Sequence, residues 1–534
     1  MKIRRRMAAV AATVTAVLFT AACAGGGAAD EPPAAPPAAD QAEEAAAPGD
    51  DEAPAGDVGA PYGHLRLGTM AIPPSWDIEG LGSGHEQTAW TAVADTILRW
   101  NPDGSPAPGL AESWEVSEDR LTVTLNIRDG VYFTDGNPAD AAAVVANMEA
   151  FKASSTRNLS MADHIAAVEA DGNVVTLTMS GPDPIILRSL GASLGIVTSP
   201  DSWDNPDAAT RPVGSGPYIM DDASISGVEY VFTANPDYWD TSWQRFERVT
   251  ITFFEDATAL NNAILGGQID VANVWGDMGV VPQFEAAGFN TSYVLLDWFG
   301  FIIGDRDGEV TPELADVRVR QAINYAIDRE GILNVFNHGR GEVTNQIFGP
   351  ATTGFVPEIV DRFPFDPERG RELVEEAGAV GAVIPMITSS AFDTGMMAAL
   401  AQQLEDVGLV LEPTMAAPGE MFNDMRSGRY SVMPMWLSTT NTWQQADYSL
   451  VPGGLFNFFG TENAEVAAFL EVIQGGSDAE AAAAAQELSA WLVENAWFAP
   501  IYFNQAAAIY ADWIDFTGVD INIMPPAYLI SPVR

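Results

Sequence analysis

Cysteine and lysine are almost absent from this chain of 534 residues. Its one cysteine is Cys23, so no disulfide can form within the chain. Lysine occurs only at Lys2 and Lys152, and the formal net charge is −48. A surface this acidic repels phosphate backbones, so we expect no nucleic-acid partner. We attribute the acidity to solubility or to a saline habitat, with a cationic ligand as the alternative.

Histidine is also scarce, and the few histidines are widely spaced: His64, His85, His164 and His338. None of them has the H-x-x-x-H spacing of metal ligands. The glycines around GLGSGH (80–85) and VGSGP (213–217) do not form a G-x-S-x-G nucleophile elbow. We therefore expect no enzyme, no cofactor and no resident metal, although His85 or His338 would be the candidates in a metal carrier.

A long apolar stretch without charged residues occurs only near the amino terminus. Residues 1–22 combine a basic start, KIRRR, with an apolar run from Met7 to Thr20 and small residues before Cys23. This pattern is typical of an export signal. The segment TAAC (20–23) resembles a lipobox, so we predict that residues 1–22 are removed and Cys23 is lipidated. The mature protein would then be anchored at the outer face of the cell membrane.

Residues 23–60 have a composition that disfavours folding. The segment 24–60 holds nine acidic residues, six prolines, no basic residue and no aromatic residue. Such a segment buries too little apolar surface to offset the entropy of ordering. We predict a tether that separates the folded region from the membrane.

From residue 61 onward, strand and helix patterns are mixed. RLTVTLNI (120–127) alternates apolar and polar residues, and a hairpin is expected around Asp171-Gly172-Asn173. The segment 316–333 has apolar residues at helical spacing. Asp366 and Gly378 bound a helix in 365–378, and Ser477 with Glu480 forms a capping box. This mixture over about 470 residues predicts an α/β protein with several lobes.

Five motifs occur in a fixed order along the chain. They are PAPGLAESWEVSEDRLTVTLNIRDGVYFTDGNPADAAAVV (106–145), PVGSGPYIM (212–220), ANPDYWD (234–240), ALNNAILGGQIDV (259–271) and DVRVRQAINYAIDREGIL (316–333). Together they resemble the family 5 extracellular solute-binding proteins of bacterial ABC importers, the peptide, nickel and oligosaccharide type. Most of these motif residues are expected to shape turns and core rather than a binding site.

The resemblance implies a two-lobe periplasmic-binding-protein-like fold with an extra subdomain in the first lobe and a hinge that closes on the ligand. We assign 61–90, 212–294 and 505–534 to lobe I. Residues 91–211 form its extra subdomain, and 295–504 form lobe II. The implied role is a receptor, expected to be a monomer, that captures a small solute and delivers it to the permease subunits of an ABC importer.

Aromatic and polar residues in loops are the candidates for a ligand pocket between the lobes. The predicted ligand-binding residues are Trp76, Trp275, Trp298, Trp436, Thr439, Asn441, Trp443 and Asp447. Peptide-binding members of the family place an Asp shortly after a Trp to pair with the ligand's amino group. Here Trp436 lacks that Asp, and Asp447 is the candidate anchor after an insertion; otherwise the anchor is lost.

The nature of the ligand stays open at this point. We favour an oligopeptide or dipeptide, because that ligand class is frequent in the family. Loss of the amine anchor would favour a sugar or another neutral ligand, bound through hydroxyl and amide groups. A nickel or other metal complex is a further alternative. A secreted enzyme and an adhesive lipoprotein without a closing cleft are the rivals from other classes.

Overall fold

A computed structural model of the protein describes residues 62–82, 84–156, 158–274, 278–417, 420–438, 441–517 and 524–533. All of these residues belong to one compact unit. The predicted signal peptide, the tether and Cys23 lie outside the described residues. Within the described part of the chain, no helix is both long and apolar enough to cross a lipid bilayer.

An eleven-stranded mixed sheet runs through the molecule. Its order is β15 (Val410–Met415), β14 (Val383–Thr388), β16 (Val432–Ser438), β12 (Asn290–Ile303), β17 (Phe498–Tyr510), β11 (Val271–Asn273), β1 (His64–Thr69), β10 (Arg248–Phe253), β9 (Glu229–Ala234) and β8 (Tyr218–Met220). The short β13 (Gly341–Val343) pairs with β17 away from this path. Strand β1 is parallel to β10 and β11, whereas β12 and β17 are antiparallel.

The first lobe is the part whose core is built from residues between Leu65 and Val271 and between Ala508 and Ile530. It carries a separate four-stranded sheet in the order β4 (Ala111–Val116), β5 (Thr122–Ile127), β7 (Val174–Met179), β6 (Ile165–Asp171), and two short pairs, β2 (Leu98–Trp100) with β3 (Pro106–Pro108) and β18 (Ile514–Phe516) with β19 (Ile530–Pro532). Its helices are α1 (Gln87–Val93), α2 (Ala141–Ala153), α3 (Ile186–Ser189), α4 (Ala257–Leu265) and α5 (Val281–Ala286). Residues 260–274 and 278–289 of this lobe pack against β17 in a smaller cluster of their own.

The second lobe is the part whose core lies between Trp298 and Phe503. It contains β13–β16 and most of the helices. These are α6 (Val317–Ala326), α7 (Arg329–Phe336), α8 (Pro367–Glu376), α9 (Thr394–Asp406), α10 (Met421–Met425), α11 (Thr442–Ser449), α12 (Ala464–Gly475) and α13 (Asp478–Glu494).

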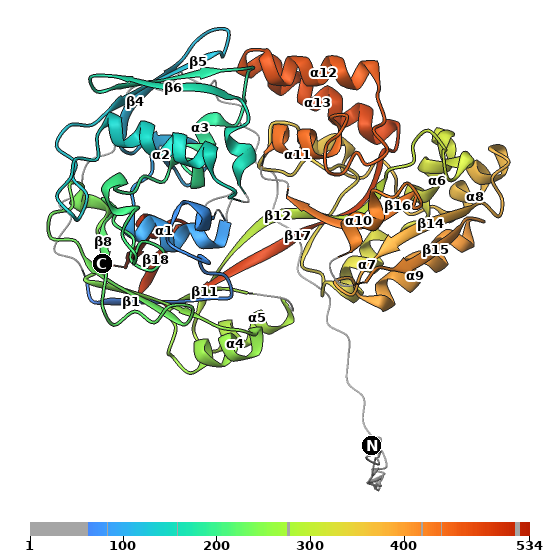
Figure 1. Cartoon of the computed structure of the whole chain (residues 1–534). Helices are drawn as coiled ribbons and strands as arrows, with labels where there is room; N and C mark the ends of the chain where they lie inside the picture. Colours follow the sequence, from blue (N-terminus) through green and yellow to red (C-terminus); the bar gives the residue numbers. More distant parts are fainter. Residues whose placement is uncertain are drawn as a thin grey trace, which may run out of the picture. The chain divides into compact units, whose positions relative to one another are not determined.

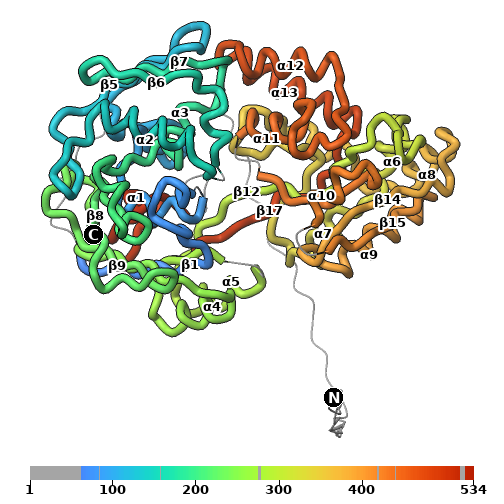
Figure 2. The backbone as a smooth tube through the Cα atoms, viewed as in Figure 1, coloured from blue at the N-terminus to red at the C-terminus, as the bar shows by residue number. Residues whose placement is uncertain are grey.

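Strands β12 and β17 are long enough to belong to both lobes. They pair from Asn290↔Tyr510 at the first-lobe end to Ile302↔Phe498 in the second-lobe core, with irregularities near Leu295 and Phe299. Figure 1 shows the two strands passing together from one group of elements to the other. In Figure 2 the carboxyl-terminal end of the tube returns among first-lobe elements, where residues 527–529 contact α1. The numerical domain boundaries predicted above stay predictions.

Local sequence signals agree with several of these elements. In β5, Val123, Leu125 and Ile127 are buried on one face, as alternation predicts, although Leu121 just before the strand is exposed. The hairpin at Gly172 forms between β6 and β7. The capping box at Ser477 and Glu480 is present at the start of α13.

The segment 316–333 is helical, as its spacing predicts, but it forms two helices, α6 and α7, rather than one continuous helix. Ile327 takes an extended conformation between them. The side chain of Asp328 then accepts a hydrogen bond from the Gly331 amide and caps the second helix. Apolar spacing alone does not reveal such a break, because a capping Asp inside a helical pattern supplies a competing local hydrogen bond.

Candidate functional site

A cavity of about 440 Å³ lies between the two lobes. Its first-lobe lining is Gly84, Trp100, Met161, Ile185, Arg188, Ser189 and Ala192. Its second-lobe lining is Leu437, Ser438, Gln444, Gln445, Tyr448, Leu455 and Phe456. A larger hollow of about 580 Å³ is lined by first-lobe residues only. A molecule held in the interlobe cavity therefore touches both lobes, whereas a molecule in the larger hollow would touch only the first lobe.

Trp100 and the short helix α3 form the first-lobe wall of the cavity. The indole Nε1 of Trp100 donates a hydrogen bond to the Arg188 carbonyl at 3.2 Å, and the indole is nearly buried. The Gly191 amide donates to the same carbonyl at 3.0 Å. A side chain at Gly191 would overlap the Trp100 ring, so glycine is needed for this close packing. These contacts fix the Trp100 indole against the backbone of residues 188–191.

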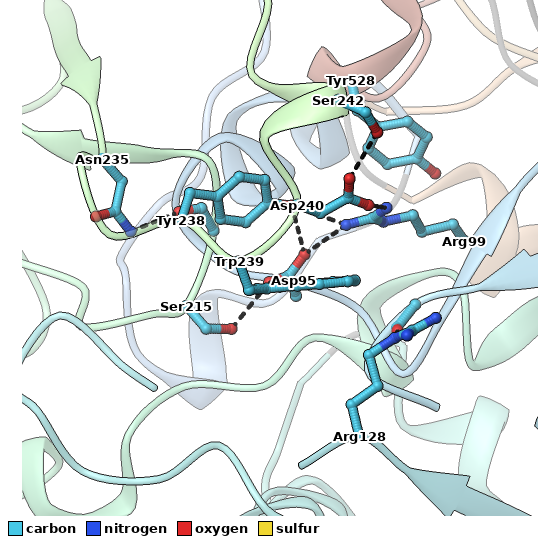
Figure 3. A network of polar contacts seen from close by, with 12 residues as sticks. Asp95, Arg99, Arg128, Ser215, Asn235, Tyr238, Trp239, Asp240, Ser242 and Tyr528 are labelled. Carbon is cyan, nitrogen blue, oxygen red and sulfur yellow. Dashed lines mark hydrogen bonds and ion pairs between the residues drawn. The ribbon is translucent and has the colours of Figure 1, made fainter. Parts of the chain in front are cut away.

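A buried polar network surrounds the side chain of Arg99 (Figure 3). Arg99, which precedes Trp100 in β2, contacts Asp95 at 3.1 Å and Asp240 at 2.7 Å. Its guanidinium also lies over the ring of Trp239, 5.0 Å from the centroid. The hydroxyl of Tyr528, near the carboxyl terminus, accepts a hydrogen bond from the Trp100 amide at 3.1 Å.

Every charged group of this network has a charged or polar partner within it. Two carboxylates face one arginine whose side chain is 4% exposed, and Asp95 also accepts bonds from Ser215, Tyr238 and Trp239. Buried charges that are paired and hydrogen-bonded in this way hold structure rather than bind a ligand. We interpret the network as support for the Trp100 wall.

Helix α11 forms most of the second-lobe wall. It begins after Asn441, whose side chain accepts a hydrogen bond from the Gln444 amide. This cap sets the helix so that Gln444, Gln445 and Tyr448 reach the cavity. The side-chain amide nitrogen of Gln444 lies 3.4 Å from the Tyr448 hydroxyl, whereas the side-chain amide of Gln445 donates a hydrogen bond to the Ser449 hydroxyl at 2.8 Å. The wall therefore offers neutral hydrogen-bonding groups.

The cavity is mainly apolar and aromatic, with a few polar groups. Arg188 is the one formally charged residue among the described residues that line it, and none of them carries a carboxylate. Burial lowers the pKa of the Arg188 guanidinium to about 10, so it stays charged at neutral pH. A pocket of this composition suits a small organic ligand with an apolar body and few polar anchors.

None of the predicted aromatic site residues that the structure describes lines the cavity. Trp76 is buried in the first-lobe core, 4.9 Å from Trp90. Trp298 is fully buried on β12. Trp436 is half-buried and stacks on Phe392 at 4.7 Å, and Trp443 is buried in α11. Trp275 and Thr439 lie outside the described residues.

The two predicted polar residues also have other neighbours. Asn441 caps α11, as described above. Asp447 lies on α11 and faces first-lobe charges, since His164 and Asp163 both act on its pKa. Burial is the main cause that raises the pKa of Asp447, and His164 opposes it. The ligand-binding roles of all these residues stay predictions.

Sequence reasoning overlooked Arg188 and Trp100. One signal for Arg188 was available, because it is the sole charged residue in the apolar run from Pro184 to Thr198. Charged side chains are seldom buried, so a charge inside such a run is a candidate for a structural or binding role. Trp100 gives no comparable signal, since its place in the wall depends on Gly191 and Tyr528, which are far away in sequence.

The structure also bears on metal binding. Among the residues it describes, no three His, Cys, Asp or Glu side chains are placed together to hold a metal ion. His85 directly follows the cavity residue Gly84 and is half-buried, and this burial lowers the pKa of its ring. His338 follows α7, in a turn with a φ of 54°.

The architecture and the interlobe cavity define a two-lobe solute-binding protein. Residues 105–457 match the family described as bacterial extracellular solute-binding proteins, family 5 (middle region). This match covers more than half of the chain, so the protein belongs to that family, as its motifs predicted. Members of the family are transport receptors rather than enzymes.

Three relatives illustrate the range of the family. The nickel-binding periplasmic protein of Escherichia coli is 26% identical over 55% of this chain and 57% of its own. Heme-binding protein A of Haemophilus influenzae is 28% identical over 51% and 53%. The glutathione-binding protein GsiB of Escherichia coli is 26% identical over 64% and 68%. The chain thus spans about half the length of the first two relatives.

Solved structures share the fold. The structure of HbpA2 from Haemophilus parasuis has a TM-score of 0.77 at 18% identity, over 88% of this chain and 100% of that one. The unliganded open form of MppA, a periplasmic murein tripeptide binding protein, has a TM-score of 0.75 at 18% identity, over 90% and 99%. The predicted two-lobe α/β fold is therefore confirmed.

Proposed function

We propose that this protein is a lipid-anchored substrate-binding protein of an ABC importer, which captures a small solute in the interlobe cavity. The observation that carries this proposal is the cavity of about 440 Å³ lined by both lobes. Because β12 and β17 join the lobes, rotation about these strands would open and close the cavity. A ligand that contacts both walls favours the closed arrangement, and the permease would recognise that arrangement.

The anchor and the location follow from the amino-terminal sequence. We propose that Cys23 carries the lipid, that residues 23–60 act as the tether, and that the receptor works as a monomer outside the cell membrane. Replacing Cys23 by Ser should shift the protein from the membrane fraction to the soluble fraction and abolish labelling by a radioactive fatty acid. Labelling that persists in this variant would reject the anchor.

For the ligand we retain the peptide as the first class to test. Relatives are named for nickel, heme and glutathione, which vary widely in chemistry. The predicted amine anchor Asp447 does not line the cavity with the other α11 residues. A sugar or a metal complex therefore stays an alternative, and the polar residues Gln444 and Tyr448 are suited to neutral groups.

A thermal-stability screen of residues 57–534 tests the receptor function. Peptides of two to six residues, organic acids, oligosaccharides and divalent metal complexes should be compared. A ligand at one hundred times its dissociation constant should add about 2.7 kcal/mol to the free energy of unfolding. The increase should be lost in Tyr448→Ala and kept in Tyr132→Ala, because Tyr448 lines the cavity and Tyr132 is an exposed first-lobe tyrosine.

Two outcomes would contradict the proposal. If no class of solute stabilises the protein, capture by lobe closure is rejected. If Tyr448→Ala and Tyr132→Ala bind a stabilising ligand equally well, the interlobe cavity is not the binding site.

A further inference from the structure

We propose that the ligand is an organic anion whose anionic group is bound by Arg188 and whose apolar body lies against Trp100, Leu455 and Phe456. This inference rests on the proposed function, because it names the chemical class of solute that the same cavity accepts. It differs from the expectation of an amine anchor, in which a carboxylate of the protein would pair with an amino group of the ligand.

The charge of the cavity lining is the first observation. Arg188 is the one charged residue among the described lining residues, in a chain that has far more acidic than basic residues. With Asp and Glu so abundant elsewhere, a described lining that includes an arginine and no Asp or Glu favours anions over cations. An ammonium group in this cavity would be repelled by Arg188 and would find no described lining carboxylate to pair with.

The position of Arg188 is the second observation. Its backbone is fixed in α3, where its carbonyl accepts from the Trp100 indole and the Gly191 amide. The guanidinium is partly removed from water, and this burial lowers the pKa of Arg188 to about 10. An anion beside it would replace part of the lost hydration with charge-assisted hydrogen bonds.

The rest of the lining matches an anion with an apolar body. Trp100, Leu455 and Phe456 offer apolar surface from both lobes. Gln444, Ser438 and Tyr448 are neutral donors on the opposite wall. A planar guanidinium can engage two oxygens of a carboxylate, or of another oxyanion, in parallel, which a point charge cannot.

A library of matched compounds tests the inference on the full chain. Each carbon skeleton, aliphatic or aromatic, is supplied as the carboxylate, the amide and the amine, and binding is measured by titration calorimetry. We expect the carboxylates to bind at least about tenfold more tightly than the amides, as befits a charge-assisted contact, and the amines not to bind. Phosphate esters of the same skeletons show whether other oxyanions share the site.

Two variants of Arg188 separate charge from folding. Arg188→Gln should lower carboxylate affinity at least about tenfold and leave amide affinity nearly unchanged, whereas Arg188→Lys should keep part of the preference for carboxylates. The matched control is Arg211→Gln, a half-buried first-lobe arginine paired with Asp222 outside the cavity. Circular dichroism and thermal midpoints of each variant establish that it is folded.

The results distinguish this inference from the function on which it rests. Amides or amines that bind as well as carboxylates, with sensitivity to Tyr448→Ala, would overturn the anion inference and keep the receptor. Equal carboxylate affinity in Arg188→Gln and the wild type would also overturn it. Failure of every skeleton in every form, together with failure of the solute screen above, would overturn both.

Discussion

Gly191 controls the shape of the candidate site through a single contact. Its Cα lies so close to the Trp100 ring that a Cβ would overlap the indole. Gly191→Ala should therefore displace Trp100 and lengthen its hydrogen bond to the Arg188 carbonyl. Overpacking of this kind costs about 1–3 kcal/mol of the free energy of unfolding, and the moved wall should weaken ligand binding. Urea unfolding and calorimetry measure the two effects.

The control for this prediction is Gly181→Ala, ten residues earlier in the same lobe. A Cβ there would meet only the His164 ring, at 3.8 Å, which is ordinary packing distance. This variant should keep both its stability and its ligand affinity. If Gly191→Ala behaves like the control, the Trp100 wall is more deformable than its packing implies.

At the scale of elements, β12 carries a charge in the segment that joins the lobes. Asp297 pairs with Ser438 on β16 and with Asn504 on β17, next to the irregularity at Leu295. Burial raises the pKa of Asp297 from 3.8 to about 6. The folded protein therefore binds a proton that the unfolded chain has released, and stability falls as pH rises through this window.

Asp297→Asn removes the free-energy cost of burying the charged carboxylate. The variant should equal the wild type below pH 4 and exceed it by about 1–3 kcal/mol in free energy of unfolding above pH 6. Urea unfolding at pH 4 and pH 7 measures the difference. Asp361→Asn, at an exposed position, should show no such pH dependence. A stabilisation that is equal at both pH values would mean that the charge of Asp297 is not the cause.

Elements with local signals were predictable from the sequence, whereas the site was not. The cap at Asp366 and the capping box at Ser477 are contained within four residues, and both occur in the structure. The break at Asp328 was missed because helical spacing continues across it. The cavity lining joins α3 to α11, some 250 residues apart in the chain, so tertiary packing decides which side chains meet there.

At the scale of the whole folded region, the two lobes also touch away from the cavity. Arg120 of the first lobe contacts Asp478 at the start of α13, and Gln474 donates to the Pro182 carbonyl at 3.0 Å. Like-charged carboxylates from the two lobes also lie close enough to repel each other across this interface. Asp183 of the first lobe has its pKa raised by burial and, to a lesser extent, by Asp447 of the second lobe and by Asp163, while the Ile185 amide and His164 lower it.

Neutralising Asp447 should therefore favour the contacting arrangement of the lobes. Asp447 and Asp183 carry like charges that repel each other while the lobes are in contact, and separation of the lobes would return both to water. Removing one charge therefore favours the closed arrangement, and Asp447→Asn should tighten ligand binding about fivefold, or roughly 1 kcal/mol. Asp183→Asn should act in the same direction, because its amide oxygen can still accept from the Ile185 amide. The double variant should gain less than the two single variants combined, since one repulsion cannot be removed twice. Calorimetry at pH 7 decides the matter: weaker binding in Asp447→Asn would instead support Asp447 as the anchor of a ligand's amino group, and it would count against lobe repulsion.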